Sequence, residues 1–458
     1  MWSGKWHFCF VQAHLFYDSL KRRHRMEKKL KKKVSRRDFL KVTGAAGAAI
    51  TLEQFLKAPY VRAAGKPPIL IGNIEPLSGP YADSGRDEFQ GAKLANDEYN
   101  RKGGVLGREI KMISEDAPSN PGIGVQKAKK LVERDKVDFL SGTLTSSVTI
   151  AISDYAWNQK VLFMAFGSHS DDTTMEKSHR TTFRTTIQNW ALSTACATWI
   201  AKNWNVRKVY HITADYTWGH TGRNSMNRII VKKFGGVELG NDFTPLGTTD
   251  FSAQLLKARG LKPDCLIVNC YGGDQVNCVK QFKEFGLDKE MKLAGPLSGT
   301  PMMKGIGTAA AGAWGMSWHG TIDTPGSKKL YAALMKAFQT YSEWRPSYRH
   351  YLGYITHTQL FEAIKRAGTT DMIPVIKALE GHKFDGLKWN PNTWRAFDHQ
   401  NIQDVLVGLA KRDENWKSED DYFEIPDHLK GEEAFPSYEE WKANGGHELE
   451  PYDMLKKA

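Results

Sequence analysis

Several residues have the chemistry for catalysis or metal binding, but none of them forms a complete site. Asp171 and Asp172 are adjacent carboxylates that could hold a metal, although acids are also favoured in the solvent-exposed first turn of a helix. Asp398 and His399 could act as an acid and a base. No nucleophile elbow, metal-ligand cluster or phosphate-binding loop accompanies either pair. We therefore expect no metal site, no cofactor and no enzymatic activity.

A glycine-rich segment and the tryptophans give equally weak signals. Gly305-Ile306-Gly307 resembles a dinucleotide-binding loop, but it does not follow the first strand, so a turn or a helix contact is the better interpretation. The 14 tryptophans suggest stacking on a sugar ring. Only Trp218 falls in a segment that could face a cleft, so it is the one aromatic candidate for ligand binding.

The N-terminal segment has the three-part layout of an export signal. A basic run (28–33) precedes Ser35-Arg36-Arg37-Asp38-Phe39-Leu40-Lys41, and a Gly/Ala-rich stretch (44–50) and Val61-Arg62-Ala63 follow. The paired arginines resemble a twin-arginine signal. Met26 would place the basic run at the N-terminus, so we interpret residues 1–25 as an over-extended start and 26–64 as the signal peptide. We expect a periplasmic protein that is soluble after signal cleavage.

Cysteine usage is compatible with export. Cys9 lies in the over-extended start, and the mature chain keeps Cys196, Cys265, Cys270 and Cys278. No Cys-x-x-Cys pair or histidine cluster accompanies them, which argues against zinc. A disulfide among the last three and buried free thiols remain alternatives.

Composition and charge exclude several classes of protein. A chain of 458 residues with 41% hydrophobic and 25% charged residues is typical of a folded protein with two or three domains. The net charge of +13 is uneven: residues 1–63 hold 15 Lys and Arg against 4 Asp and Glu, whereas the rest holds 49 against 47. The basicity therefore belongs to the leader, and a nucleic-acid partner is not expected.

The remaining chain alternates apolar runs with segments of helical spacing. Strands are expected near 68–74, 109–114, 137–142, 161–165, 208–212, 237–239, 265–268, 292–294 and 404–410. Helices are expected near 89–99, 124–135, 147–158, 191–203, 222–234, 251–259, 274–285, 328–341, 348–367 and 371–379. This alternation predicts an α/β fold with parallel sheets covered on both faces. It restarts after residue 184, which indicates two similar lobes whose strand ends face a shared gap.

An ordered series of short motifs resembles the branched-chain amino-acid type of periplasmic substrate-binding proteins, which serve ABC importers. The series begins with Pro76-Leu77-Ser78-Gly79-Pro80-Tyr81, Gly103-Gly104-Val105-Leu106-Gly107-Arg108 and Glu115-Asp116. It continues with Leu131-Val132-Glu133, Phe183-Arg184, Thr249-Asp250-Phe251, Pro263-Asp264 and Phe285-Gly286-Leu287. The likeness covers roughly residues 67–410. It implies two Rossmann-like lobes with a ligand cleft between them, the type I periplasmic binding protein fold.

The resemblance also implies the boundaries of the lobes. We expect the first lobe to comprise residues 66–185 and 318–400, and the second to comprise 188–314 and 403–458, with the end of the chain as a wrapping tail. The chain would cross between the lobes three times. The hinge residues implied by these crossings are Phe183, Arg184, Trp318 and Asp398.

The family's ligand loops can be placed on this chain. The serine that holds the ligand carboxylate corresponds to Ser146, followed by Ser147, where a helix N-terminus would also favour an anion, although a plain helix cap fits the same position. The next loop corresponds to Gly167-Ser168-His169. The aromatic lid of the second lobe corresponds to Trp218, and Tyr271 can also face the gap.

The most informative departure from the family is Leu297. Amino-acid binders of the family carry an acid there, which pairs with the α-ammonium group, and leucine cannot replace it. A buried ammonium without a partner costs several kcal/mol. An ordinary α-amino acid is therefore disfavoured unless another acid, such as Asp274, reaches in. We expect an amino-acid relative, an amide, or an aliphatic or aromatic acid.

The resemblance implies the partners of the protein. They are a small-molecule ligand, an inner-membrane ABC permease and the twin-arginine export machinery, and we expect a monomer. Two alternatives stay open: a ligand-sensing domain for a signalling partner, and an exported α/β enzyme. A neighbouring kinase gene would favour sensing, and turnover of a ligand would favour an enzyme.

Overall fold

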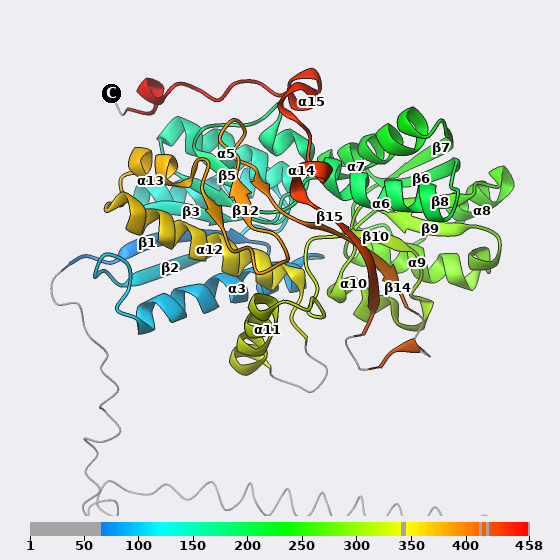
Figure 1. Cartoon of the computed structure of the whole chain (residues 1–458), viewed down its shortest axis with the longest axis horizontal. Helices are drawn as coiled ribbons and strands as arrows, with labels where there is room; N and C mark the ends of the chain where they lie inside the picture. The colour runs from blue at the N-terminus through cyan, green and yellow to red at the C-terminus, as the bar shows by residue number, and fades with distance from the viewer. Residues whose placement is uncertain (1–65, 340–344, 412–414, 418–420, 457–458) are drawn as a thin grey trace, which may run out of the picture. The chain divides into compact units, whose positions relative to one another are not determined.

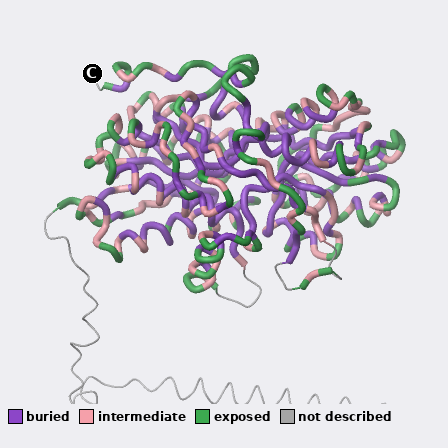
Figure 2. Tube along the Cα trace, viewed as in Figure 1, coloured by how far each residue is buried: buried purple, intermediate pink, exposed green. Residues whose placement is uncertain are grey.

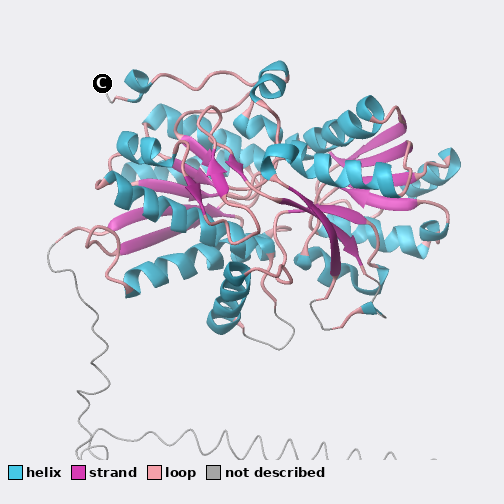
Figure 3. Cartoon of the chain, in the orientation of Figure 1, coloured by secondary structure: helices cyan, strands magenta, loops and turns pink. Residues whose placement is uncertain are grey.

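The computed structural model describes residues 66–339, 345–411, 415–417 and 421–456. The expected over-extended start (1–25), the signal peptide (26–64) and Cys9 lie outside these residues. The described chain forms two α/β lobes, each built on its own sheet (Figures 1 and 3). The expectation of an α/β fold with two lobes is confirmed.

The first lobe contains a five-stranded parallel sheet in the order β2-β1-β3-β4-β5. Its strands are β1 (Ile69–Glu75), β2 (Ile110–Asp116), β3 (Phe139–Gly142), β4 (Phe163–Ala165) and β5 (Thr182–Arg184). Helices α3 (Ala82–Arg101) and α12 (Tyr348–Ala367) pack together on one face, and α4 (Pro121–Lys129) and α5 (Ser146–Gln159) cover the other. Phe139 and Leu140 are both fully buried, in separate hydrophobic clusters on the two faces, which explains the apolar runs in the sequence. Figure 2 shows that the interior of the described chain consists mainly of buried residues.

The second lobe contains a seven-stranded sheet in the order β15-β14-β10-β9-β8-β6-β7. Its strands are β6 (Lys208–Ala214), β7 (Val237–Thr244), β8 (Cys265–Asn269), β9 (Lys292–Gly295), β10 (Ala313–Met316), β14 (Val405–Ala410) and β15 (Phe423–Leu429). The last two strands pair antiparallel, and the others are parallel. The helices of this lobe are α6 (Asn189–Asn203), α7 (Thr217–Asn227), α8 (Ser252–Leu261), α9 (Gly273–Glu284) and α10 (Thr300–Ile306).

The chain passes between the two sheets at three places, close to the expected crossings. The first crossing (185–188) joins β5 to α6, the second (317–324) joins β10 to α11 (Pro325–Phe338), and the third (403–404) joins β13 to β14. A small sheet of β11 (Lys383–Phe384), β12 (Asn392–Trp394) and β13 (Asn401–Ile402) precedes the third crossing. α13 (Met372–Leu379) packs on α12. None of the strands expected from the sequence corresponds to this small sheet.

The end of the chain returns to the first lobe. α14 (Gly431–Ala434) packs on α6, after which α15 (Tyr438–Ala443) and a 3₁₀ turn (Tyr452–Leu455) follow. The Trp441 indole donates to the Thr174 carbonyl at 2.8 Å, and the Arg180 amide donates to Glu450 at 2.8 Å. Of the expected second-lobe segment 403–458, β14 and β15 join the second sheet and α14 packs on the second lobe, whereas Trp441 and Glu450 contact the first lobe. The exact lobe boundaries stay a prediction.

The four described cysteines are free and fully buried, which decides between the two alternatives left open by the sequence. Burial raises the pKa of the thiols of Cys196 and Cys270 to about 12. Gly305-Ile306-Gly307 ends α10, with Gly307 at a φ of +59°. In the described part of the chain, no helix is both long and apolar enough to cross a membrane.

Candidate functional site

A small pocket lies where the strand ends of both sheets meet. The loops after β3, β4, β6, β8 and β9 and the first turn of α12 supply its lining. The lining residues are Leu144, Ser146, Gly167, His169, Tyr216, Trp218, Tyr271, Leu297 and Arg349. The cavity volume of the pocket is about 10 Å³. This is room for about one water, so a larger solute requires the lobes or their side chains to move apart.

Six of the eight residues predicted to bind a ligand line this pocket: Ser146, Gly167, His169, Trp218, Tyr271 and Leu297. The other two do not. The Ser168 hydroxyl lies 2.8 Å from that of Thr173 inside the first lobe, and Ser147 is the half-buried second residue of α5. The pocket brings the six together, while their role in binding stays a prediction.

Two first-lobe side chains place neutral polar groups at the pocket. Ser146 is the first residue of the 14-residue helix α5, and its hydroxyl accepts a hydrogen bond from the Ser170 amide at 3.2 Å. His169 Nδ1 lies 2.6 Å from the Ile187 carbonyl, which requires a proton on that nitrogen. Burial, with help from Arg349, lowers the pKa of His169 well below its usual value. The imidazole is therefore neutral.

Aromatic side chains from the second lobe form one wall of the pocket. The ring of Trp218 lies 6.1 Å from Tyr216 and 6.3 Å from Tyr271, measured between centroids. Trp218 is buried, and its Nε1–H has no hydrogen-bond partner among the described residues. A buried donor without a partner costs about 1–3 kcal/mol, which makes this N–H a candidate for contact with a bound solute.

Arg349 is the main site residue that the sequence analysis missed. It lies in the first turn of α12 and is 1% exposed. Its Nη1 donates to Glu88 at 2.6 Å and to the Gly167 carbonyl at 3.1 Å, and its Nε donates to the Tyr271 hydroxyl at 3.1 Å. Tyr271 belongs to the second lobe, so this guanidinium joins the two lobes at the pocket. No local pattern in the sequence distinguishes Arg349 from an arginine on a helix surface.

Two buried acids stand behind Arg349. Glu75 and Glu88 are both 0% exposed. Burial raises the pKa of each carboxyl, and repulsion from Glu88 adds to the shift of Glu75. Arg349 opposes the shift of Glu88 but does not cancel it. Both shifts favour the neutral carboxyl form, and Glu88 forms an ion pair with Arg349 at 2.6 Å that opposes its own shift.

The alternative acid suggested by the sequence does not reach the pocket. The Asp274 carboxylate accepts from the Gly247 amide at 3.1 Å, and Asp274 is not among the lining residues. Leu297, by contrast, is 1% exposed and lines the pocket as expected. The lining therefore contains one cation and no acid.

The predicted hinge residues lie at or near the crossings. Phe183 and Arg184 end β5, and the Arg184 guanidinium donates to Gln188 at 2.7 Å. The Trp318 indole donates to Ser327 at 3.0 Å across the second crossing. Asp398 pairs with Arg395 before β13. Their role in hinge motion stays a prediction.

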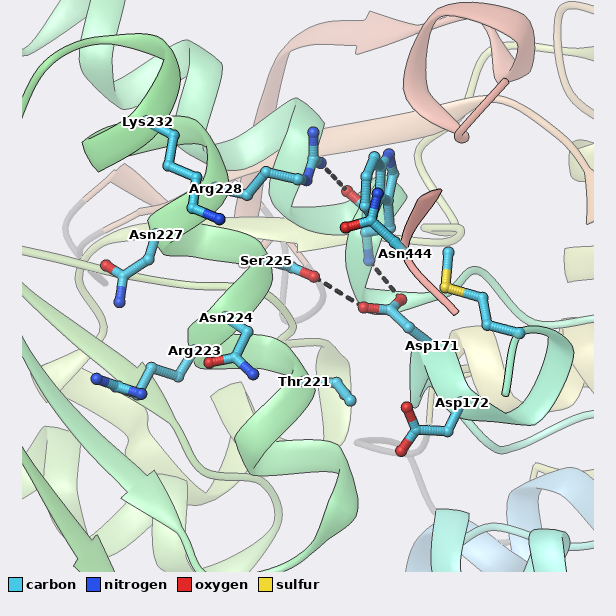
Figure 4. Close-up of a pocket in the computed structure, with 12 residues that line it drawn as sticks. Asp171, Asp172, Thr221, Arg223, Asn224, Ser225, Asn227, Arg228, Lys232 and Asn444 are labelled. Atoms are coloured by element: carbon cyan, nitrogen blue, oxygen red, sulfur yellow. Dashed lines mark hydrogen bonds between the residues drawn. The ribbon is translucent and has the colours of Figure 1, made fainter. Parts of the chain in front are cut away.

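A larger hollow of about 470 Å³ lies between the lobes, and Figure 4 shows the residues that line it. Asp171, on the first lobe, accepts from Ser225 of α7 at 2.8 Å and from the Trp190 amide of α6 at 2.7 Å. We expected Asp171 in a solvent-exposed turn, but it is 7% exposed because these second-lobe groups cover it. The described residues contain no group of three or more His, Cys, Asp or Glu that could hold a metal.

The Asp171 contacts predict a role in lobe closure. Asp171→Ala removes two hydrogen bonds between the lobes, worth about 0.5–1.5 kcal/mol each, and should shift the lobes toward open forms. Small-angle X-ray scattering should show a larger radius of gyration for Asp171→Ala, and an unchanged value for Asp172→Ala, which alters the neighbouring acid. Equal radii for Asp171→Ala and the unaltered protein would contradict the role.

The same contact predicts a pH dependence. Burial raises the pKa of Asp171 to about 6, against about 3.9 when the carboxyl is exposed. Closed lobes therefore bind this proton more tightly than open ones, and the contribution of Asp171 to closure grows as the pH falls from about 6 toward 4. The difference in radius between Asp171→Ala and the unaltered protein should widen over that range.

Two α/β lobes that close around a small pocket at their strand ends define a bilobed solute-binding protein. The chain belongs to the periplasmic binding protein family, whose sequence profile matches residues 68–415. A twin-arginine translocation signal matches residues 33–52. The protein is therefore an exported, periplasmic solute-binding protein, as the sequence motifs predicted.

Individual relatives agree with this assignment. The chain is 29% identical over 244 residues to the Leu/Ile/Val-binding protein BraC3 of Rhizobium johnstonii, covering 53% of this chain and 65% of that protein. It is 26% identical to Leu/Ile/Val-binding protein homolog 3 of Brucella melitensis, covering 69% and 84%. A periplasmic binding protein from Burkholderia mallei superposes with a TM-score of 0.76 at 27% identity, covering 81% and 97%.

Proposed function

We propose that this protein binds a small carboxylate with a flat, apolar or aromatic body and delivers it, chemically unchanged, to an inner-membrane ABC permease. In this proposal it acts as a monomer and is not an enzyme. Closure of the two lobes would remove the solute from water, so that a few polar groups decide which solute is held.

The observation that carries the proposal is the charge of the pocket lining. Arg349, the N-terminus of α5 at Ser146 and the free N–H of Trp218 all favour an anion or an acceptor. No lining residue is an acid, and Leu297 occupies the position where an ammonium partner would be expected. An α-amino acid would bury its ammonium unpaired, at a cost of several kcal/mol, whereas a simple carboxylate would not.

The aromatic wall supports a flat solute body. Trp218, Tyr216 and Tyr271 offer ring faces and edges on which another aromatic ring can pack. Two structural neighbours bind such molecules. A Rhodopseudomonas palustris BisB5 solute-binding protein is in complex with 3,4-dihydroxybenzoic acid (24% identity, TM-score 0.70), and another from R. palustris is in complex with benzoate (20% identity, TM-score 0.69).

A thermal-shift screen of the exported protein tests the proposal. Benzoate, 4-hydroxybenzoate and 3,4-dihydroxybenzoate should raise the melting temperature, since a ligand at 100 times its Kd stabilises the folded state by about 2.7 kcal/mol. Benzamide is the matched control, because it has the shape of benzoate without its charge. Chromatography after incubation should recover each compound unchanged.

The screen can also contradict the proposal. Stabilisation by leucine or benzamide, with no response to the three carboxylates, would reject a carboxylate-binding pocket. Conversion of a bound compound to a new product would contradict the proposal that the protein delivers its solute unchanged.

A further inference from the structure

A buried lysine lies where two hinge segments leave the second sheet. Lys388, in the loop between β11 and β12, is 6% exposed. Its ammonium donates to the Ser317 carbonyl at 2.7 Å, the Asp404 carbonyl at 2.7 Å and the Gln403 side-chain oxygen at 2.8 Å. All three N–H groups thus bind acceptors on the second and third crossings.

The acceptors of Lys388 lie at the point where the second and third crossings leave the second sheet. β10 and β14 pair antiparallel up to Met316 and Leu406. Ser317 and Asp404 lie just beyond this paired region, where both segments turn toward the first lobe. The two carbonyls that leave the sheet are therefore bonded by a side chain instead of by a neighbouring strand.

Gln403 links Lys388 to the first crossing. Its side-chain oxygen accepts from Lys388, and its Nε2 donates to the Thr185 carbonyl at 2.6 Å in the first crossing. A continuous chain of hydrogen bonds thus runs from Ser317 through Lys388 and Gln403 to Thr185. All three crossings are joined by two buried side chains.

The loop that holds Lys388 is attached to the first lobe. The Leu387 carbonyl accepts from the hydroxyls of Thr324 and Ser327 at 2.6 Å, and the Gly386 carbonyl accepts from Tyr351 of α12 at 2.9 Å. The lysine stem is thus fixed to one lobe, while its ammonium holds the backbone that leads into the sheet of the other.

We propose that Lys388 is a positioning residue for solute binding, which acts by tying the three crossings together and so limiting how far the lobes open. Opening requires the backbone at the crossings to rotate, and such a rotation turns the Ser317 and Asp404 carbonyls away from the ammonium. A buried ammonium separated from its acceptors is strongly unfavourable, so the tie opposes wide opening. Lys388 lies outside the pocket and touches no part of the solute.

Spin-label distance measurements on the exported protein without added solute test this role. Labels on Lys129→Cys in α4 and Lys280→Cys in α9 report the separation of the lobes, and the four native cysteines are fully buried. In Lys388→Met, the distance distribution should broaden and shift to longer distances. Lys388→Arg, which keeps the charge and donors, should restore much of the narrow distribution.

Two further variants are needed: a control at an exposed lysine, and a substitute in case Lys388→Met does not fold. Lys383→Met is the matched control, because Lys383 lies in β11, just before the loop that holds Lys388, but is exposed, so its distribution should match that of the unaltered protein. Gln403→Met breaks only the Gln403 links and decides the question when Lys388→Met does not fold. A distribution as narrow as that of the unaltered protein in a folded Lys388→Met, or in Gln403→Met in its place, would overturn the proposal.

Discussion

Arg349→Met should weaken binding of benzoate, with at least about a 30-fold rise in Kd. The guanidinium is the one cation in the pocket lining, and removal of one partner of a buried charge pair costs about 2–5 kcal/mol, which is roughly 30- to 4,000-fold in affinity. Isothermal titration calorimetry of the exported protein measures the change. Arg366→Met is the matched control, because Arg366 lies on the same helix but is exposed.

The Arg349 variant also removes the partner of Glu88, so a loss of folding must be separated from a loss of binding. The double variant Arg349→Met/Glu88→Gln leaves no unpaired buried charge at this contact and should recover part of the lost thermal stability. It should not recover benzoate binding. Tight benzoate binding by a folded Arg349→Met protein would show that the cation does not hold the carboxylate.

Trp218→Ala should weaken binding of the same solute by roughly 30- to 150-fold, because loss of a large aromatic wall costs about 2–3 kcal/mol. Ser146→Ala should have a smaller effect, about 0.5–1.5 kcal/mol for one hydrogen bond. Fluorescence or calorimetric titration measures both. Trp389→Ala is the matched control, since Trp389 is 41% exposed and lies outside the pocket.

The two pocket variants test the assignment of the site independently of the fold. If both Trp218→Ala and Ser146→Ala bind with unchanged affinity, the pocket is not the binding site, although the two lobes remain. An effect of Trp218→Ala alone would retain the pocket but remove Ser146 from the contacts with the solute.

Most of the fold could be predicted because buried parallel strands are apolar on both faces. The run Cys265–Val268 becomes β8, whose five residues are all buried. β15 gave no such signal, because Phe423–Leu429 contains a proline, two acids and a histidine, and only Phe423 is buried. It is an edge strand held by pairing with β14, and tertiary contacts of this kind are invisible in local sequence.

The residues of the candidate site likewise fall into those that the sequence could locate and those that depend on long-range contacts. Ser146, Trp218 and Leu297 follow strands, so the fold rule and the family pattern together located them. Arg349 comes from a helix far along the chain, and its contacts with Gly167 and Glu88 span 182 and 261 residues. Long-range contacts of this kind, like that of Lys388 with Ser317, follow only from the packed structure.

The burial of the four thiols determines how they react with oxidants and disulfides in an oxidising compartment. A thiol must form the thiolate to react with an oxidant or exchange with a disulfide, and burial keeps Cys196 and Cys270 protonated at any physiological pH. The described thiols are therefore unreactive in the folded protein, and no disulfide joins them. Unfolding would expose all four at once, so alkylation by a thiol reagent reports how often the chain opens, and each modified molecule would be trapped outside the native state.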